Sequence, residues 1–384
     1  MRLNSYDGWS PLQEVIVGSA ENYTTHEAEL SFKLFFYDQL SEQKSFYDRQ
    51  YYPVISPPGA GGRPEAGVQS PIKRRYVEEL NEDVEGIAQT LESLSVTVHR
   101  PMPLAEVSQV ETLAWPAAVL PPLNIRDNTL ILGDEIIETP PQVRSRYFET
   151  QLLKKVFQGY FEQGARWTVM PRPIMTDASF DPSYAERSPG GPAEFIKQPS
   201  ASPYDTGFEM MIDGAQCLRL GRDLMINVST KNHALGVDWL ERHLEGRFRI
   251  HRVSMTDNHI DSMVLALRPG LLLVRTPRVA EMLPEPLRKW DMIFAPEPEV
   301  NAFPSYDDDD LVLTSPYIDL NVLSVDPETV LVNEACPELM RTLERHGFTA
   351  VPVRHRHRRL FGGGLHCFTL DTVRRGSVLE DYLG

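Results

Sequence analysis

A thiol that follows directly after a run of glycines is the first candidate for chemistry in this sequence. Residues 361–371 read FGGGLHCFTLD, so that Gly362–Gly364 precede His366 and Cys367. Glycine lets backbone or ligand approach closely and permits positive φ. A cysteine beyond such a run suits a nucleophile, and it suits a small buried hydrophobic side chain equally well. The segment alone leaves both interpretations open.

A cysteine nucleophile needs a base or a positive neighbour, and the base usually needs a carboxylate to orient it. His366 is adjacent to Cys367, but neighbouring side chains of an extended segment point to opposite faces, so we do not expect it to be the partner. In TDNHIDSMV, His259 stands between Asp257 and Asp261, on one face if the segment is extended. Carboxylates beside an imidazole stabilise its protonated form. The alternative is a surface histidine in a polar turn.

Other polar clusters are weaker candidates. The YDDDD segment at 306–310 lacks the spaced ligands and turn glycine of a calcium loop, so we expect a solvated acidic loop. His355 and His357 lack a third metal ligand. The basic run RHRHRR at 354–359 is interpreted as a solvated strand or loop edge. No P-loop, dinucleotide-binding glycine motif or G-x-S-x-G elbow occurs.

The bulk composition is that of a globular protein with reduced thiols. The chain has 384 residues, 41% hydrophobic and 24% charged, with a formal net charge of −16. This balance argues against a nucleic-acid partner, because phosphate binding needs clustered Lys and Arg. No apolar run approaches the ~18 residues that span a membrane. The three cysteines are widely spaced with no C-x-x-C. We expect a cytoplasmic protein.

An amphipathic helix followed by a short strand recurs along the chain, often with a glycine between them. We expect such pairs at 76–101, 147–171, 237–253 and 337–353. Turns that lead into apolar strands alternate with them, as in RDNTLILGDEII and RPGLLLVRTP, at a spacing that suggests repeats. This favours β/α repeats around an axis, although a doubly wound sheet would alternate similarly. We predict one domain over 1–384, with loops near 53–71 and 188–206 that are rich in Pro and Gly.

Five blocks of the sequence together resemble the arginine-dependent amidinotransferases, in the same order and over essentially the whole chain. They are LNSYDGWSPLQEVIVG, RDNTLILGDEIIETPPQVRSRYFE, HIDSMVLALRPGLLL, SPYIDLNVL and FGGGLHCFTLDTVRRGS. The resemblance implies a five-bladed α/β-propeller of pseudo-repeated ββαβ modules (pentein-like), with the site at its centre. It also implies L-arginine as donor, a small-molecule amine as acceptor, and a homodimer. It implies no metal and no organic cofactor.

The resemblance also implies roles for seven residues. The nucleophile falls on Cys367, the general acid/base on His259, the carboxylate that orients it on Asp213, the guanidinium-binding carboxylates on Asp127 and Asp261, and the residues for the donor's α-carboxylate on Arg278 and Ser315. Two carboxylates can hold the planar guanidinium by paired, charge-assisted hydrogen bonds and fix its face toward sulfur. We expect the glycines before Cys367 to keep the approach of this bulky group open, and Cys217 and Cys336 to be structural.

The match departs from the glycine-specific enzymes just before His259. The segment SMTDNHID is shorter here, and Asn258 stands where those enzymes carry a methionine. That region lines the acceptor side in the family, so we expect an acceptor other than glycine, a larger amine of a secondary-metabolite pathway. Two alternatives remain from the residues: an arginine deiminase-like hydrolase on the same fold, and a non-catalytic guanidine-binding module. Retention of Cys367, His259 and Asp213 speaks against mere binding.

Overall fold

The computed structural model describes residues 2–24, 30–32, 73–106, 109–181, 207–256, 259–299, 314 and 316–384. The predicted loops at 53–71 and 188–206 and the acidic segment at 306–310 lie outside the described residues, as do Asn258 and Ser315. Within the described ranges, no helix combines the length and the apolar composition needed to cross a membrane.

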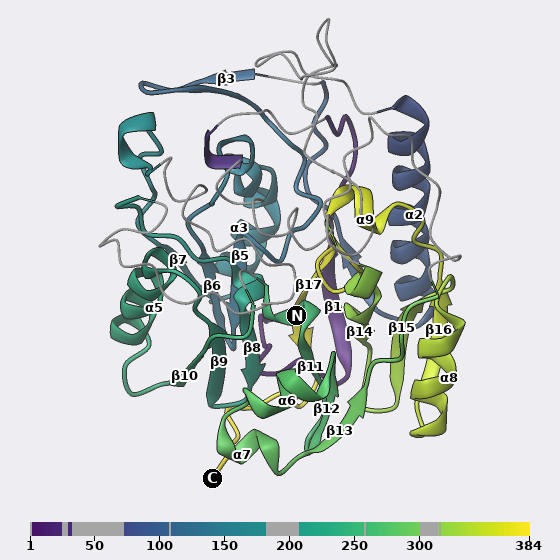
Figure 1. The fold of residues 1–384 in the computed structure, drawn as a ribbon. Helices are drawn as coiled ribbons and strands as arrows, with labels where there is room; N and C mark the ends of the chain where they lie inside the picture. Colours follow the sequence, from purple (N-terminus) through teal and green to yellow (C-terminus); the bar gives the residue numbers. More distant parts are fainter. Residues whose placement is uncertain are drawn as a thin grey trace, which may run out of the picture.

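Five three-stranded sheets share one topology (Figure 1). In each, the first strand runs antiparallel to the second, and the second runs parallel to the third after a helical connection. The modules are β17 (Thr369–Arg374), β1 (Leu12–Val17), α2 (Arg74–Ser93) and β2 (Thr97–His99); β5 (Thr129–Leu132), β6 (Glu135–Glu138), α3 (Lys154–Glu162) and β7 (Arg166–Val169); β8 (Cys217–Leu220), β9 (Asp223–Asn227), α5 (Lys231–His243) and β10 (Arg249–Val253); β11 (Val264–Arg268), β12 (Leu271–Val274), α6 (Pro277–Glu281), α7 (Glu285–Arg288) and β13 (Asp291–Phe294); and β14 (Leu323–Ser324), β15 (Thr329–Asn333), α8 (Pro337–Arg345) and β16 (Thr349–Val353). A separate hairpin pairs β3 (Gln109–Glu111) with β4 (Pro116–Ala118).

Alternating side chains of the inner strands join each module to both of its neighbours. In β5, Leu130 and Leu132 pack with the β8–β10 module, whereas Ile131 packs with β1 and β17. This follows from the period of two along a strand whose two faces are both buried. Five hydrophobic clusters link consecutive modules in this way, and one of them joins β14–β16 to β1 and α2. The ring is therefore closed, which confirms the five-bladed propeller and excludes a doubly wound sheet.

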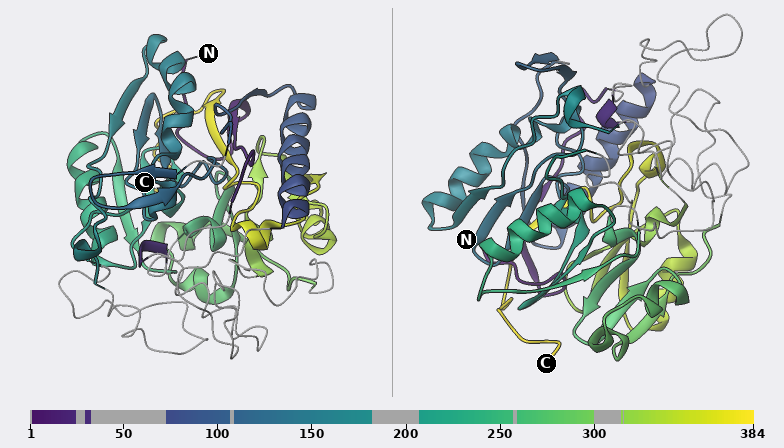
Figure 2. Two further views of the ribbon diagram at one scale, coloured as in Figure 1. Left: turned by 90° about the horizontal axis from the view of Figure 1, so that it is seen from above. Right: turned by 60° about the vertical axis from the view of Figure 1, so that its left-hand side comes forward.

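All four predicted helices are present, although α3 begins at Lys154 rather than at 147 and α5 at Lys231 rather than at 237. In α2, the buried residues Leu80, Val84, Ile87 and Leu91 follow the three-and-four spacing of one helix face. Glycines at 164, 246 and 347 have φ of 95°, 74° and 84°, the left-handed conformation that ends a helix. The helices lie around the outside of the strands (Figure 2), so that each module presents the edge of its first strand to the centre.

The basic run at 354–359 is not a solvated edge, contrary to the expectation. Arg358 is 1% exposed and lies in α9 (Arg358–Phe361), where its guanidinium pairs with Asp319 at 2.9 Å. Arg356 pairs with Asp83 at 2.8 Å, and His357 bonds to Glu79 of α2. Because these carboxylates come from segments far away in the sequence, the local pattern of the run could not reveal that its charges are paired and buried.

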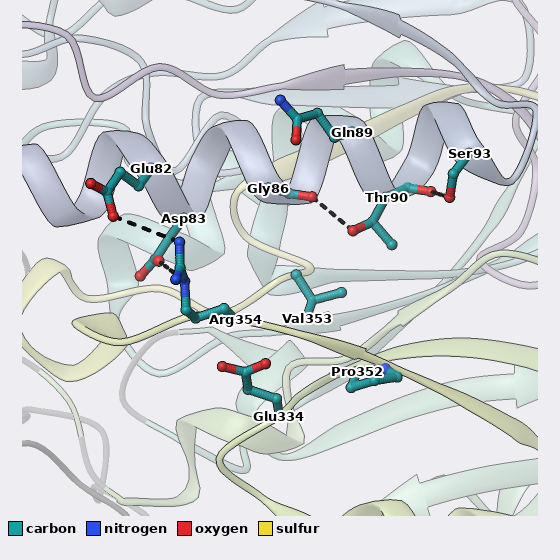
Figure 3. Close-up of a pocket in the computed structure, with 10 residues that line it drawn as sticks. All are labelled: Glu82, Asp83, Gly86, Gln89, Thr90, Ser93, Glu334, Pro352, Val353 and Arg354. Atoms are coloured by element: carbon teal, nitrogen blue, oxygen red, sulfur yellow. Dashed lines mark hydrogen bonds and ion pairs between the residues drawn. The ribbon is translucent and has the colours of Figure 1, made fainter.

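A cavity of about 460 Å³ lies between α2 and the end of β16 (Figure 3). Glu82, Asp83 and Glu334 contribute carboxylates to its lining, and Arg354 pairs with the first two of them. None of the six predicted site residues that the structure describes lines this cavity. Its charged groups join α2 to the strand beside it, and we assign it no chemistry.

Candidate active site

Five of the seven predicted site residues occupy equivalent places in the ring. Each lies in the turn or short 3-10 helix that leads into the first strand of a module. Asp127 precedes β5, Asp213 precedes β8, His259 and Asp261 precede β11, and Cys367 precedes β17. Because the first strands pack side by side around the centre, their N-terminal ends converge and bring these turns together. The ring thus assembles one site from segments far apart in the sequence. The bond from Arg126 Nε to the backbone carbonyl of His366, for example, joins residues 240 positions apart.

His259 lies between carboxylates, although its segment is not extended as expected. It precedes η5 (Ile260–Ser262), a 3-10 helix. Its Nε2 bonds to Asp213 Oδ2 at 2.8 Å, and its Nδ1 lies 3.8 Å from Asp127 Oδ1. Burial alone would lower the pKa of His259, but the charges of Asp127, Asp213 and Asp261 and the bond to Asp213 outweigh it and raise the pKa to about 9. The imidazole is therefore protonated at neutral pH.

Asp213 is held at the start of η4 (Gly214–Gln216) by its own backbone. The N–H of Asp213 donates to Gln216 Oε1 at 2.7 Å, and Gln216 Nε2 donates to the carbonyl of Asn227 at 2.8 Å. Asp213 itself is 1% exposed. These bonds fix the carboxylate against His259 before any ligand is present, which is the preorganisation that an acid/base pair requires.

Asp127 and Asp261 each leave one carboxylate oxygen without a hydrogen bond. Asp127 Oδ2 accepts from Arg146 at 2.7 Å, and Asp261 Oδ2 accepts from His366 at 2.8 Å. The Oδ1 atoms of both residues are buried and have no hydrogen-bond partner among the described residues. A buried, unsatisfied carboxylate oxygen is costly, so it indicates a place for a donor that arrives with a ligand. Two such oxygens suit a cation with several N–H groups.

Arg146 and Glu149 support Asp127, and sequence reasoning assigned neither of them a role. Arg146 Nε and Nη2 bond to the two oxygens of Glu149 at 2.7 and 2.9 Å, while Nη1 reaches Asp127. Burial raises the pKa of Glu149 to about 7 despite the charge of Arg146. Both residues lie in the QVRSRYFE part of the resemblance. That location was the available signal, but the pairing with Asp127 depends on the tertiary structure.

Cys367 is a buried thiol beside a carboxylate. It is 2% exposed, and its Sγ lies 3.5 Å from Asp261 Oδ2. Burial, Asp261 and Asp127 raise the pKa of the Cys367 thiol well above its ordinary value, so the thiol is protonated in the free protein. The other two cysteines are also buried, in the apolar clusters between modules, as their predicted structural role requires.

The glycines before Cys367 let the loop pack tightly; this differs from the open approach that we expected. A Cβ at Gly363 would overlap the side chain of Asn124, and a Cβ at Gly364 would lie 2.5 Å from Cβ of Asn321. Real Cβ atoms do not approach one another this closely. The glycines therefore seat the Cys367 turn against the turns that precede β5 and β14.

No contact joins Arg278 to the other predicted site residues that the structure describes. Arg278 is exposed on α6 and makes no hydrogen bond or ion pair with any described residue. Ser315 lies outside the described residues. The buried cation nearby in sequence is Arg275, whose guanidinium lies 4.5 Å from the ring centroid of Tyr317. The assignment of the donor's α-carboxylate to Arg278 and Ser315 stays a prediction.

Three of these residues also satisfy the distances of a metal site. One ligand atom each of Asp127, His259 and Cys367 lie within 4.8 Å of one another. Imidazole and thiol must both be deprotonated before they bind a metal. The raised pKa values of His259 and Cys367 place protons on both groups at neutral pH. The chemistry that this arrangement favours is therefore proton transfer and nucleophilic attack.

The comparisons with known proteins agree with this geometry. No family model matches the chain. It is 32% identical over 380 residues to a putative inosamine-phosphate amidinotransferase 2 of Streptomyces griseus, with 98% of each chain covered. It is 33% identical to the L-arginine:L-lysine amidinotransferase of Pseudomonas savastanoi pv. phaseolicola, covering 82% of this chain and 83% of the relative. Among solved structures, the amidinotransferase SxtG of Microseira wollei superimposes with a TM-score of 0.78 at 31% identity, with 99% of each chain covered. The chain belongs to the amidinotransferases and is an enzyme that transfers an amidino group.

Proposed function

We propose that this amidinotransferase takes the amidino group of L-arginine onto Cys367, releases L-ornithine, and passes the group to an amine acceptor in a ping-pong reaction. The observation that supports this most directly is that Asp127 and Asp261 each keep a buried, unsatisfied Oδ1, while the other oxygen of Asp261 lies 3.5 Å from Cys367 Sγ. A guanidinium supplies the N–H donors that both oxygens lack, and its positive charge matches theirs.

The first half-reaction uses the proton on His259. When the guanidinium binds, its charge offsets Asp127 and Asp261, the carboxylates that raise the thiol pKa, and the thiol proton leaves to solvent. The thiolate forms a C–S bond to the guanidinium carbon. Protonated His259 then gives its proton to the departing nitrogen, the C–N bond breaks, and L-ornithine leaves. A cationic amidino-cysteine and a neutral imidazole remain.

The second half-reaction reverses these roles. The acceptor amine loses a proton to neutral His259 as its nitrogen bonds to the amidino carbon. The C–S bond breaks, the guanidino product leaves, and Cys367 returns as thiolate and then thiol. Asp213, bonded to Nε2 of His259, stabilises the imidazolium in both halves. One cysteine and one histidine thus serve both steps, with Asp127 and Asp261 holding the cationic group throughout.

The acceptor is proposed to be a primary amine larger than glycine. The shorter segment before His259, with Asn258 in place of a methionine, supports this. The relatives' names include an inosamine-phosphate enzyme and an L-lysine enzyme, and also glycine amidinotransferases of similar identity, so the proposal rests on the segment before His259. A panel of amines offered to the loaded protein, with guanidino products identified by mass, distinguishes these classes from glycine.

Incubation with L-arginine and no acceptor tests the covalent half-reaction. We expect the intact mass to rise by about 42 Da, one amidino group, with release of L-ornithine. Cys367→Ala should show no gain, whereas Cys217→Ala, which removes a buried cysteine from another module, should load like the unchanged protein. L-citrulline in place of L-ornithine would instead indicate a hydrolase. If neither an adduct nor L-ornithine nor L-citrulline formed, the proposal would be overturned.

The loading rate should rise with pH and then level off. Below pH 9 the free protein holds protons on both His259 and Cys367. The attack requires the Cys367 thiolate together with the His259 imidazolium, so the reactive form has one proton fewer than the free protein. The kcat/KM for L-arginine should therefore rise about tenfold per pH unit and level near pH 9, where His259 loses its proton. Single-turnover release of L-ornithine from pH 6 to 10 measures this. A rate that declines between pH 7 and 9 would contradict the assigned protonation states.

A further inference from the structure

His366 bonds to the same carboxylate oxygen that faces the thiol. Its Nδ1 lies 2.8 Å from Asp261 Oδ2, and Cys367 Sγ lies 3.5 Å from that same oxygen. The other oxygen of Asp261, Oδ1, is buried and unbonded among the described residues. His366 therefore fixes which edge of the Asp261 carboxylate faces sulfur and which remains for a ligand. The resemblance assigned no role to this histidine.

The backbone around His366 is anchored independently of its side chain. The N–H of Cys367 donates to Asn321 Oδ1 at 2.9 Å, and the N–H of His366 donates to the carbonyl of Asn321 at 3.1 Å. Arg126 Nε donates to the carbonyl of His366 at 2.9 Å. These bonds hold the turn from both sides. A change of the His366 side chain thus tests the bond to Asp261 rather than the course of the loop.

The surroundings of His366 keep its imidazole neutral, so that it donates a hydrogen bond to Asp261 without carrying a charge. Burial and the charge of Arg126 lower its pKa to about 4, although Asp261 and Asp371 oppose them. The pKa of Asp261 is low, about 2, because the bond from His366 and the charge of His259 outweigh burial. A lysine or arginine in place of His366 would neutralise the carboxylate and compete with the guanidinium. A neutral N–H orients Asp261 and leaves its negative charge for the ligand.

We propose that His366 is a positioning residue for donor binding: its Nδ1–H fixes Oδ2 of Asp261 beside Cys367, so that Oδ1 is presented to the guanidinium. This inference rests on the proposed function, since it concerns how the L-arginine site is kept ionised and aligned. His366 does not touch the reacting atoms itself. It acts through Asp261, and its loss should affect loading with L-arginine first.

Three substitutions test this role by where they place an N–H. Asparagine can place its amide nitrogen near the position of Nδ1, glutamine places it nearer that of Nε2, and alanine has none. We expect His366→Asn to keep kcat/KM for loading within about threefold. His366→Ala and His366→Gln should lose about 10- to 100-fold, the range for a hydrogen bond to a charged group. A purely structural role would not separate asparagine from glutamine.

The pH dependence gives a second readout that packing alone would not change. Without the Nδ1–H bond, the pKa of Asp261 rises, and the carboxylate takes up a proton at acid pH in the variant but not in the unchanged protein. The ratio of kcat/KM for loading in the unchanged protein to that in His366→Ala should therefore increase as the pH falls from 7 to 5. A constant ratio, or loading equal to that of the unchanged protein, would overturn the proposal.

The controls separate this proposal from the proposed function. If the unchanged protein forms no amidino-cysteine, the proposed function fails, whatever the variants do. If it loads and His366→Ala does not fold, as thermal unfolding would show, the pair His366→Asn and His366→Gln decides. Equal rates for that pair would overturn the positioning role. His346→Ala, which removes a histidine at the end of α8 outside this site, should load normally.

Discussion

Replacing His259 by glutamine should slow the release of L-ornithine from bound L-arginine by about 10²- to 10⁴-fold, the usual contribution of a positioned acid. The imidazole bonds to Asp213 at 2.8 Å and carries a proton at neutral pH, since its pKa is raised to about 9. Glutamine retains a hydrogen-bonding amide but cannot give up a proton. Single-turnover measurements of L-ornithine release, with binding followed separately, would place the loss in the chemical step.

The identity of the leaving group provides the matched control. L-canavanine carries an oxygen next to the nitrogen that departs, so its leaving amine is a much weaker base and needs less help from an acid. His259→Gln should therefore lose far less activity with L-canavanine than with L-arginine. His243→Gln, on α5 and paired with Glu135, serves as a substitution outside the site. An equal loss with both donors would show that His259 acts otherwise than as an acid.

The elements were predictable from the sequence because their signals are local. The apolar spacing fixed α2 and α8 to within a few residues, and the glycines fixed the ends of α3 and α5, whose starts differ more from the prediction. Closure of the ring, in contrast, has no local signal in the sequence. Leu130, Ile131 and Leu132 are all buried, and nothing in this run shows that alternate residues pack against different modules. The repeat spacing suggested an axis, and the hydrophobic clusters between the modules show how it closes.

The site was only partly predictable for the same reason. Cys367 and His259 stood out from their neighbours in the sequence, but the segments were assumed to be extended, whereas both lie in turns before a strand. Asp213 has no local signal and came from the resemblance alone. Asn321 and His366 gain their meaning from bonds across modules, and Arg146 from a bond to Asp127 within its own module. The position just before the first strand of each repeat is the sequence signal that connects the site residues other than Arg146, and it is visible once the repeats are defined.

Asp127→Asn should change two reactions of Cys367 in opposite directions. Asparagine would accept from Arg146 through its oxygen and turn its NH₂ toward the guanidinium, a donor facing a donor. Loading from L-arginine should lose about 10²- to 10³-fold in kcat/KM, as expected when one partner of a buried charge pair is removed. Alkylation by iodoacetamide at a fixed pH should become faster, because Asp127 is one of the two carboxylates that raise the pKa of the thiol.

The opposite signs make this variant more informative than a simple loss of activity. A disordered site would lose amidination as well, but it would expose all the cysteines, which peptide mapping of the alkylated residues would reveal. Asp134→Asn, in the exposed turn between β5 and β6, removes a carboxylate from the same module and should change neither rate. If Asp127→Asn slowed both reactions, the carboxylate would be supporting the thiolate rather than opposing it. The guanidinium would then not be the group that offsets its charge, and the thiol would have to be activated before the donor binds.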